Sequence, residues 1–162
     1  METPMTSPVA PSINRRALLI GASAVAAVGI GGPVSAAEPV WTNFWGLAIR
    51  GYDPVAYFSD GKPVEGLKAH EIEWMGASWR FATAENKNKF LADPEAFAPQ
   101  YGGYCAWAVA NGYTASTVPE AWEIVDGKLY LNYSLGVRET WRQDIPGNIR
   151  KGDAKWPGLR EG

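Results

Sequence analysis

Apolar and polar residues alternate along Leu67–Met75, and this period of two predicts a β-strand. One face of the strand carries His70, Ile72 and Trp74, and glutamates lie on the other face. Residues 76–78 are expected to turn the chain, and the aromatic residues that follow share one face of a returning strand. The pattern therefore predicts a hairpin with one aromatic face.

A second hairpin is predicted closer to the C-terminus. Trp122–Val125 and Lys128–Asn132 both have a strand-like pattern. They flank Asp126-Gly127, a residue pair that favours a two-residue hairpin turn.

Short helices are predicted where a capping residue precedes an apolar segment. The expected helices are Pro54–Phe58 after Asp53, Ala84–Ala92 after Thr83 with Phe90 and Leu91 buried, Pro94–Phe97 after Asp93, Cys105–Ala110, Leu135–Gln143 after Ser134, and a short helix that follows an interruption at Pro146-Gly147 and runs to Lys155. Trp156-Pro157 is expected to end the ordered part of the chain. Short helices mixed with hairpins predict a small single domain of the α+β class.

The first 37 residues are typical of an export signal. Arg15 and Arg16 precede the apolar run Ala17–Ile30, and small residues at 34–37 suit a signal peptidase. The arginine pair resembles the twin-arginine consensus, which implies the twin-arginine translocase as a partner and a periplasmic or otherwise exported protein. An ordinary secretory signal and an uncleaved anchor are the alternatives. As a helix the run would rise only about 21 Å, short of the roughly 30 Å membrane core, so cleavage near Ala36 or Ala37 is favoured.

Composition limits what the remaining segment, residues 38–162, can do. All eight tryptophans lie in it, and we expect most of them to be buried in one core. It has no further apolar run long enough for a stable membrane span after cleavage. The whole chain has a formal net charge of −2 and no basic patch, which argues against nucleic acid as a partner.

Phe97–Trp107 gathers aromatic residues, two adjacent glycines and the single cysteine of the chain, Cys105. The glycines permit positive φ or a close approach of backbone or ligand, and the tyrosine hydroxyls could orient a ligand or an ion. The candidate pocket residues are Tyr101, Gly102, Gly103 and Tyr104. The alternative is a tight turn in which Cys105 is an inert core residue.

Several motifs together resemble the YHS domain family, and more closely its exported branch. They are Gly51-Tyr52-Asp53-Pro54-Val55-Ala56-Tyr57-Phe58, Gly76-x-x-Trp79-x-Phe81, Phe90-x-x-Asp93-Pro94-x-x-Phe97, Tyr101-Gly102-Gly103-Tyr104-Cys105-Ala106, Asp126-Gly127-Lys128-Leu129-Tyr130-Leu131-Asn132 and Trp156-Pro157. The resemblance runs from Ile49 to Pro157 and implies a YHS-like α+β fold. The compact form of the family is thought to bind heavy metals through cysteines.

This chain departs from that metal pattern. Ala56 stands where the compact form has a cysteine, and residues 81–86 contain no thiol. A copper or zinc site would have to use Cys105 and His70, which are the only thiolate and imidazole donors, together with oxygen ligands. Such a metal site requires that the fold bring Cys105 and His70 together. Otherwise His70 is an ordinary strand residue. The identity of any cofactor stays open.

Three functions remain at this point. The first is an exported binding module for a heavy metal or small ligand, without catalysis. The second is a structural or protein-interaction domain without a ligand. The third is an enzyme that uses the Cys105 thiol, which would need a base beside it. Arg138 and Arg142, one helical turn apart, could bind an anion or form a solvated face.

Overall fold

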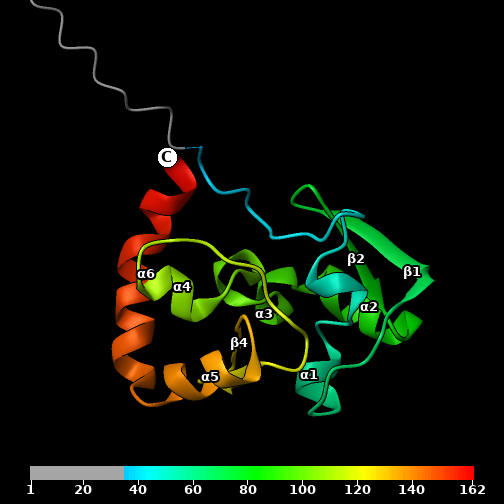
Figure 1. Ribbon diagram of the computed structural model, residues 1–162. Coiled ribbons are helices and arrows are strands. Elements are labelled where there is room, and N and C mark those ends of the chain that lie inside the picture. The colour runs from blue at the N-terminus through cyan, green and yellow to red at the C-terminus, as the bar shows by residue number, and fades with distance from the viewer. Residues whose placement is uncertain (1–34) are drawn as a thin grey trace, which may run out of the picture. The chain divides into compact units, whose positions relative to one another are not determined.

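The computed structural model describes residues 35–162. They form two small antiparallel hairpins, several short helices and one longer C-terminal helix (Figure 1). This is the α+β domain that the sequence predicts, and residues from Pro33 to Gly162 form one unit. The predicted export signal, with Arg15 and Arg16, lies almost wholly outside the described residues. No helix in the described part of the chain is long and apolar enough to cross a membrane.

The first hairpin pairs β1 (Leu67–Trp74) with β2 (Ala77–Phe81). Trp74 lies opposite Ala77, so the turn consists of Met75 and Gly76 alone, with φ of 51° and 75°. The turn was expected at residues 76–78, but positive φ at two successive residues gives the tighter turn that matches strand twist. Trp79 and Phe81 of β2 are buried, as their shared face predicts.

The second hairpin follows the prediction closely. β3 (Trp122–Val125) pairs with β4 (Lys128–Leu131), and Asp126 and Gly127 form the turn with φ of 50° and 74°. A buried residue, Asn132, continues from β4 toward the next helix.

Most of the predicted helices form close to the expected residues. They are α1 (Ala56–Ser59), α2 (Ala84–Ala92), α3 (Pro94–Phe97), α4 (Ala106–Ala110) and α5 (Leu135–Arg142). Thr83, Asp93 and Ser134 each accept a hydrogen bond from a backbone N–H in the first turn of the helix that follows. Burial of Leu91 was a wrong prediction: Phe90 is fully buried, but its neighbour points outward and is 55% exposed.

The C-terminal helix corrects a second expectation. α6 runs without interruption from Ile145 to Glu161 and contains Pro157. Pro146 lies in its first turn, where its missing N–H is harmless, and the Asp144 carboxylate caps the helix by accepting from Gly147 N at 3.0 Å. The segment read as a break is therefore a helix start.

Buried apolar residues form two clusters. The first lies between the β1–β2 hairpin, α1 and α2, and includes Trp79, Phe81 and Phe90. The second lies between α4, β4 and the two C-terminal helices, and includes Tyr101, Tyr130 and Trp141. Only Trp79 and Trp141 among the tryptophans are fully buried. The prediction that most tryptophans are buried is therefore wrong: most of the others are half-buried and Trp45 is exposed, because a small domain has too little interior to enclose so many indoles.

Asp53 ties the first cluster together. Its carboxylate is fully buried and accepts from Val55 N at 2.8 Å and Ala56 N at 3.3 Å, which fixes the turn that leads into α1. The predicted cap is therefore displaced: α1 begins at Ala56, with Val55 and not Asp53 at its N-cap position. The second oxygen accepts from Ala82 N and from the Asn86 side-chain amide, both at 2.8 Å. One side chain therefore joins the start of α1 to the end of β2 and to α2.

Candidate functional site

The glycine pair of Phe97–Trp107 forms a short left-handed turn. Tyr101, Gly102 and Gly103 have φ of 57°, 60° and 82° in succession. A Cβ on Gly102 would collide with the carbonyl oxygen of Pro39, while the Gly102 carbonyl accepts from Trp41 N at 2.9 Å. The glycine is thus required both by its φ and by the close approach of the segment that enters the domain.

This stretch contributes to the walls of two separate hollows. Tyr101 and Gly102 line a cleft of about 360 Å³, whereas Cys105 lines an apolar pocket of about 280 Å³. We call the first the tryptophan cleft and the second the cysteine pocket. The lining of the cysteine pocket includes two tyrosines, Tyr113 and Tyr133, together with Trp107 and Val137.

The tryptophan cleft combines flat aromatic walls with charge. Three tryptophans line the cleft: Trp74 at the end of β1, Trp79 on β2 and Trp156 on α6, so indoles reach it from distant parts of the sequence. Lys128, at the start of β4, and Arg160, near the end of α6, also line it. Within residues 35–162 neither cation has an ion-pair partner, and Glu95 is the one acidic residue of the lining. The cleft therefore offers an unneutralised excess of positive charge between apolar surfaces.

Trp156 is held firmly in this wall. Its ring packs against Tyr101 and Tyr104 with centroid distances of 6.0 Å and 5.7 Å. The Tyr101 hydroxyl donates to Asp153 Oδ1 at 2.9 Å, and burial, with that carboxylate, raises the pKa of the tyrosine. Its hydroxyl therefore secures α6 instead of facing a ligand, which differs from the role expected for it.

Cys105 is a buried thiol at the start of α4. Its Sγ accepts from Tyr133 N at 3.3 Å and lies 3.7 Å from Asn132 Oδ1, which itself accepts from Trp107 N at 3.1 Å. Backbone N–H groups favour the thiolate, but burial outweighs them and raises the pKa of Cys105. The thiol is therefore neutral at physiological pH, and its 1% exposure fits the core alternative.

The structure does not bring His70 to Cys105. His70 lies on β1 and Cys105 directly before α4, and Figure 1 shows these two elements at opposite sides of the domain. Between residues 35 and 162 no group of three or more His, Cys, Asp or Glu side chains is placed to hold a metal ion. The copper or zinc site that uses Cys105 and His70 together therefore has no geometric basis in this part of the chain.

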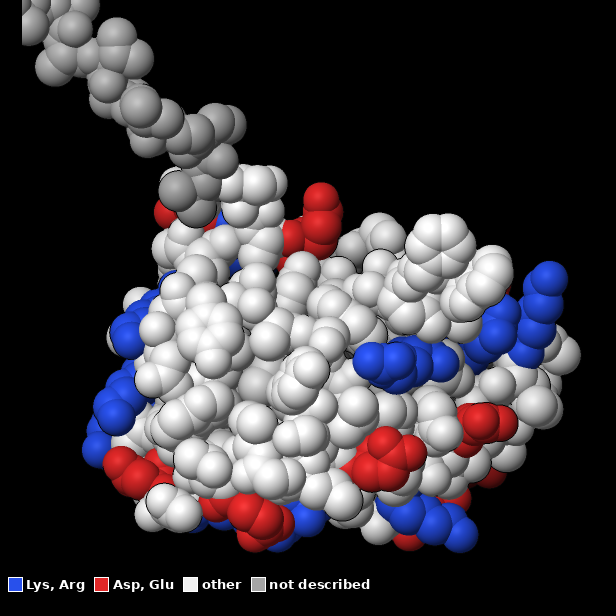
Figure 2. Space-filling view, viewed as in Figure 1, with Lys and Arg blue, Asp and Glu red and all other residues white. Residues whose placement is uncertain are grey.

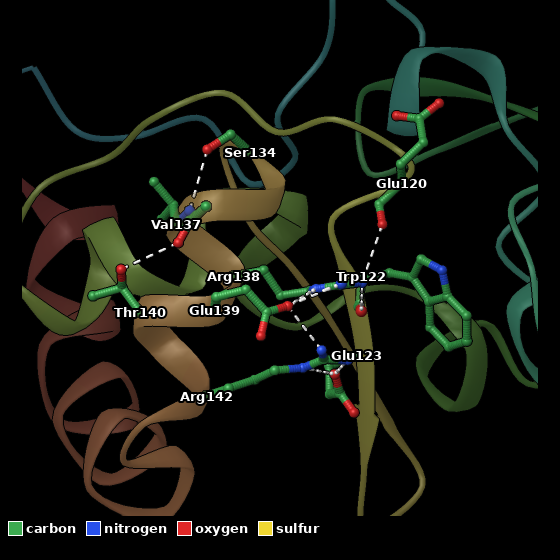
Figure 3. A network of polar contacts seen from close by, with 10 residues as sticks. Glu120, Trp122, Glu123, Ser134, Val137, Arg138, Glu139, Thr140 and Arg142 are labelled. Atoms are coloured by element: carbon green, nitrogen blue, oxygen red, sulfur yellow. Dashed lines mark hydrogen bonds and ion pairs between the residues drawn. The ribbon is translucent and has the colours of Figure 1, made fainter.

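Arg138 and Arg142 do not form an anion site. Glu139 lies between them and contacts Arg138 Nη2 at 3.0 Å and Arg142 Nη1 at 2.9 Å (Figure 3). Arg142 also pairs with Glu123 of β3. The two arginines are thus neutralised by two glutamates and attach α5 to the second hairpin.

The comparison with protein families bears on the first half of the domain. Residues 55–101 match the model of the YHS domain family. This YHS segment extends from α1 through the first hairpin to Tyr101, and it ends before Cys105, the second hairpin and α6. No curated protein and no solved structure matches the chain. The wider resemblance from Ile49 to Pro157 and its exported branch stay predictions.

Sequence reasoning missed the cations of the tryptophan cleft. Arg160 lay beyond the expected end of order at Trp156-Pro157, and Lys128 was read only as a strand residue. The signal that could have found Arg160 is Asp144, followed by Pro146 two residues later, because this spacing is typical of a helix start.

Proposed function

We propose that this protein is an exported binding module that holds a small organic anion with a flat apolar body and catalyses no reaction on it. The observation that carries the proposal is the tryptophan cleft, where Lys128 and Arg160 lie beside Trp74 and Trp156 and have no ion-pair partner within the described part of the chain. Indole faces suit a planar apolar group, and the two cations suit a carboxylate or sulfonate. The cleft volume of about 360 Å³ is in the usual range for small-molecule sites.

An organic ligand is favoured over a metal ion. YHS domains are often associated with metals, but the residues that would supply soft ligands are replaced here, as at Ala56. Cys105 and His70 are also on different elements and do not converge. A site for zinc or copper needs several such donors within bonding distance of one point.

Binding without catalysis is favoured over a thiol-dependent enzyme. A nucleophilic cysteine needs a lowered pKa or an adjacent base, whereas burial raises the pKa of Cys105 and no imidazole lies beside it. A structural domain without a ligand is the remaining alternative, and it would leave the unpaired cations without a role.

Export is the second part of the proposal, and the twin-arginine translocase is the partner that the arginine pair implies. Ala37 N donates to Leu159 O at 2.8 Å, so cleavage after Ala36 preserves a contact that cleavage after Ala37 removes. Replacement of Arg15 and Arg16 by lysine should retain the precursor inside the cell. Normal export of that variant would favour the general secretory route, and mass spectrometry of the exported protein would locate the cleavage.

The ligand part can be tested with a matched pair of probes. Anilinonaphthalene sulfonate has a flat apolar body and an anionic group, and N-phenylnaphthylamine has the same body without the charge. We expect Lys128→Gln/Arg160→Gln to lower the affinity for the sulfonate at least about tenfold and to change the affinity for the amine little. Each charged hydrogen bond contributes roughly 1.5–3 kcal/mol before solvent screening.

The control changes the same charge elsewhere. Arg150→Gln/Lys151→Gln removes two exposed cations from α6 outside the cleft. Fluorescence titration should give unchanged affinity for the control. If both double variants lower the affinity for the sulfonate equally, its binding depends only on the net charge of the protein. If the parent protein does not bind it at all, the structural domain without a ligand is favoured.

A further inference from the structure

Phe44 and Trp45 form the most exposed aromatic feature of the described residues. Their exposed fractions are 92% and 76%, and their rings meet edge to face with centroids 5.2 Å apart. They occupy the tip of a turn between Asn43 and Gly46, before the YHS segment. Single exposed apolar residues are common, but two large rings at one tip make a cohesive apolar projection.

The turn that carries these rings is fixed by hydrogen bonds. The Asn43 side chain accepts from Trp45 N and Leu47 N, both at 3.0 Å. Gly46 O accepts from Ser78 N at 3.0 Å, and Ser78 O accepts from Ala48 N at the same distance. The projection is therefore anchored to β2 and is ordered before it meets any partner, which reduces the entropy lost on binding.

Positive charge lies beside the projection. In Figure 2 the surface over this turn is uncharged and protrudes, and Lys and Arg side chains lie next to it. Arg50 follows the turn, is exposed and donates through Nε to Thr117 O at 2.9 Å, with its guanidinium 5.3 Å from the Trp41 ring. Its terminal nitrogens have no partner among residues 35–162 and can approach a phosphate. Glu73, the acidic residue near Ser78, is engaged by the Ser78 hydroxyl.

We propose that this turn docks the domain on an anionic phospholipid bilayer, with Phe44 and Trp45 inserted at the headgroup level and Arg50 bound to lipid phosphate. Tryptophan favours this depth because its ring is apolar and its N–H remains hydrated, and phenylalanine adds buried apolar area. The segment that enters the domain, from Ser35 onward, runs along the same upper side of the domain as the turn (Figure 1). The inference does not depend on the tryptophan cleft.

The test uses flotation with vesicles of phosphatidylethanolamine and phosphatidylglycerol, compared with vesicles of phosphatidylcholine alone. Residues 35–162 are used because they contain both hydrophobic clusters of the domain, whereas the apolar run before them would bind lipid by itself. We expect Phe44→Ser/Trp45→Ser to lower the partition coefficient at least about tenfold on anionic vesicles. Leu91→Ser, which alters a 55% exposed apolar residue on α2, should leave it unchanged.

Arg50 variants separate charge from apolar insertion. Arg50→Gln should reduce binding to the anionic vesicles about fivefold and binding to phosphatidylcholine little, and Arg50→Lys should restore it. The proposal is overturned if the parent domain does not float with anionic vesicles, or if Leu91→Ser matches the double variant. It is also overturned if sedimentation shows that the aromatic turn joins two copies of the chain and that the double variant only dissolves this dimer.

Discussion

Asp53→Asn should destabilise the domain far more than an isosteric change of an exposed cap. The native carboxylate accepts four hydrogen bonds, and both of its oxygens are used. An amide in its place retains one acceptor for Val55 N and Ala56 N, but its Nδ2 group faces the donors of Ala82 and Asn86. The side-chain amide of Asn86 can rotate to present its oxygen, whereas the Ala82 backbone cannot.

The magnitude follows from those contacts. The change leaves one backbone donor unpaired and removes the charge from the surviving bonds, which together amount to about 2–3 kcal/mol of unfolding free energy. Asp93→Asn is the matched control, because Asp93 caps α3 with a single acceptor at 3.2 Å and asparagine caps equally well. We expect that control to change stability by less than about 0.5 kcal/mol.

Urea unfolding followed by tryptophan fluorescence measures both variants, with an unchanged m-value required for the comparison. Asp53→Asn/Asn86→Asp exchanges amide and carboxylate and should recover about 1 kcal/mol, because the bond between the two side chains then has a charged acceptor again, which the single variant lacks. A loss below about 1 kcal/mol for Asp53→Asn, or equal losses for it and Asp93→Asn, would refute the assignment of Asp53 as the tie between α1, β2 and α2.

Three further variants or measurements test other parts of the structure. Trp79→Ala should lower the unfolding free energy by about 3–5 kcal/mol, since a fully buried indole is removed, and a near-normal melting temperature would contradict its placement in the core. Gly102→Ala should lower the melting temperature more than Gly61→Ala does. Both glycines have φ near 60°, but only a Cβ at Gly102 would collide with Pro39 O; equal melting temperatures would contradict this. Cys105 should react with iodoacetamide more slowly than free cysteine and with a midpoint at higher pH, because burial raises its pKa; a fast reaction at neutral pH would restore the thiol-enzyme hypothesis.

The fold was largely predictable because its signals are local. The turn pair Asp126-Gly127 and the caps Thr83, Asp93 and Ser134 act on the next few residues, and the structure confirms each of them. The errors arose where a local signal has two meanings. Pro146 can break a helix or begin one, and Asp144 decided in favour of the start.

The candidate site was predictable only in part. Phe97–Trp107 does lie at the walls of two hollows, but its partners come from segments far away in the sequence. Trp74 and Trp156 line the same cleft although β1 and α6 lie far apart in the sequence. The expected approach of His70 to Cys105 failed for the same reason, since periodicity shows which face a residue occupies but not which element covers that face.

Nuclear magnetic resonance of the tryptophan side chains tests the central proposal most directly, because each indole N–H gives its own signal. With anilinonaphthalene sulfonate as the probe, we predict that the signals of Trp74 and Trp156 shift in proportion to occupancy, and that those of Trp45 and Trp107 stay in place. Shifts confined to Trp107 would move the site to the cysteine pocket, and the absence of any saturable shift at Trp74 and Trp156 would contradict binding in the tryptophan cleft.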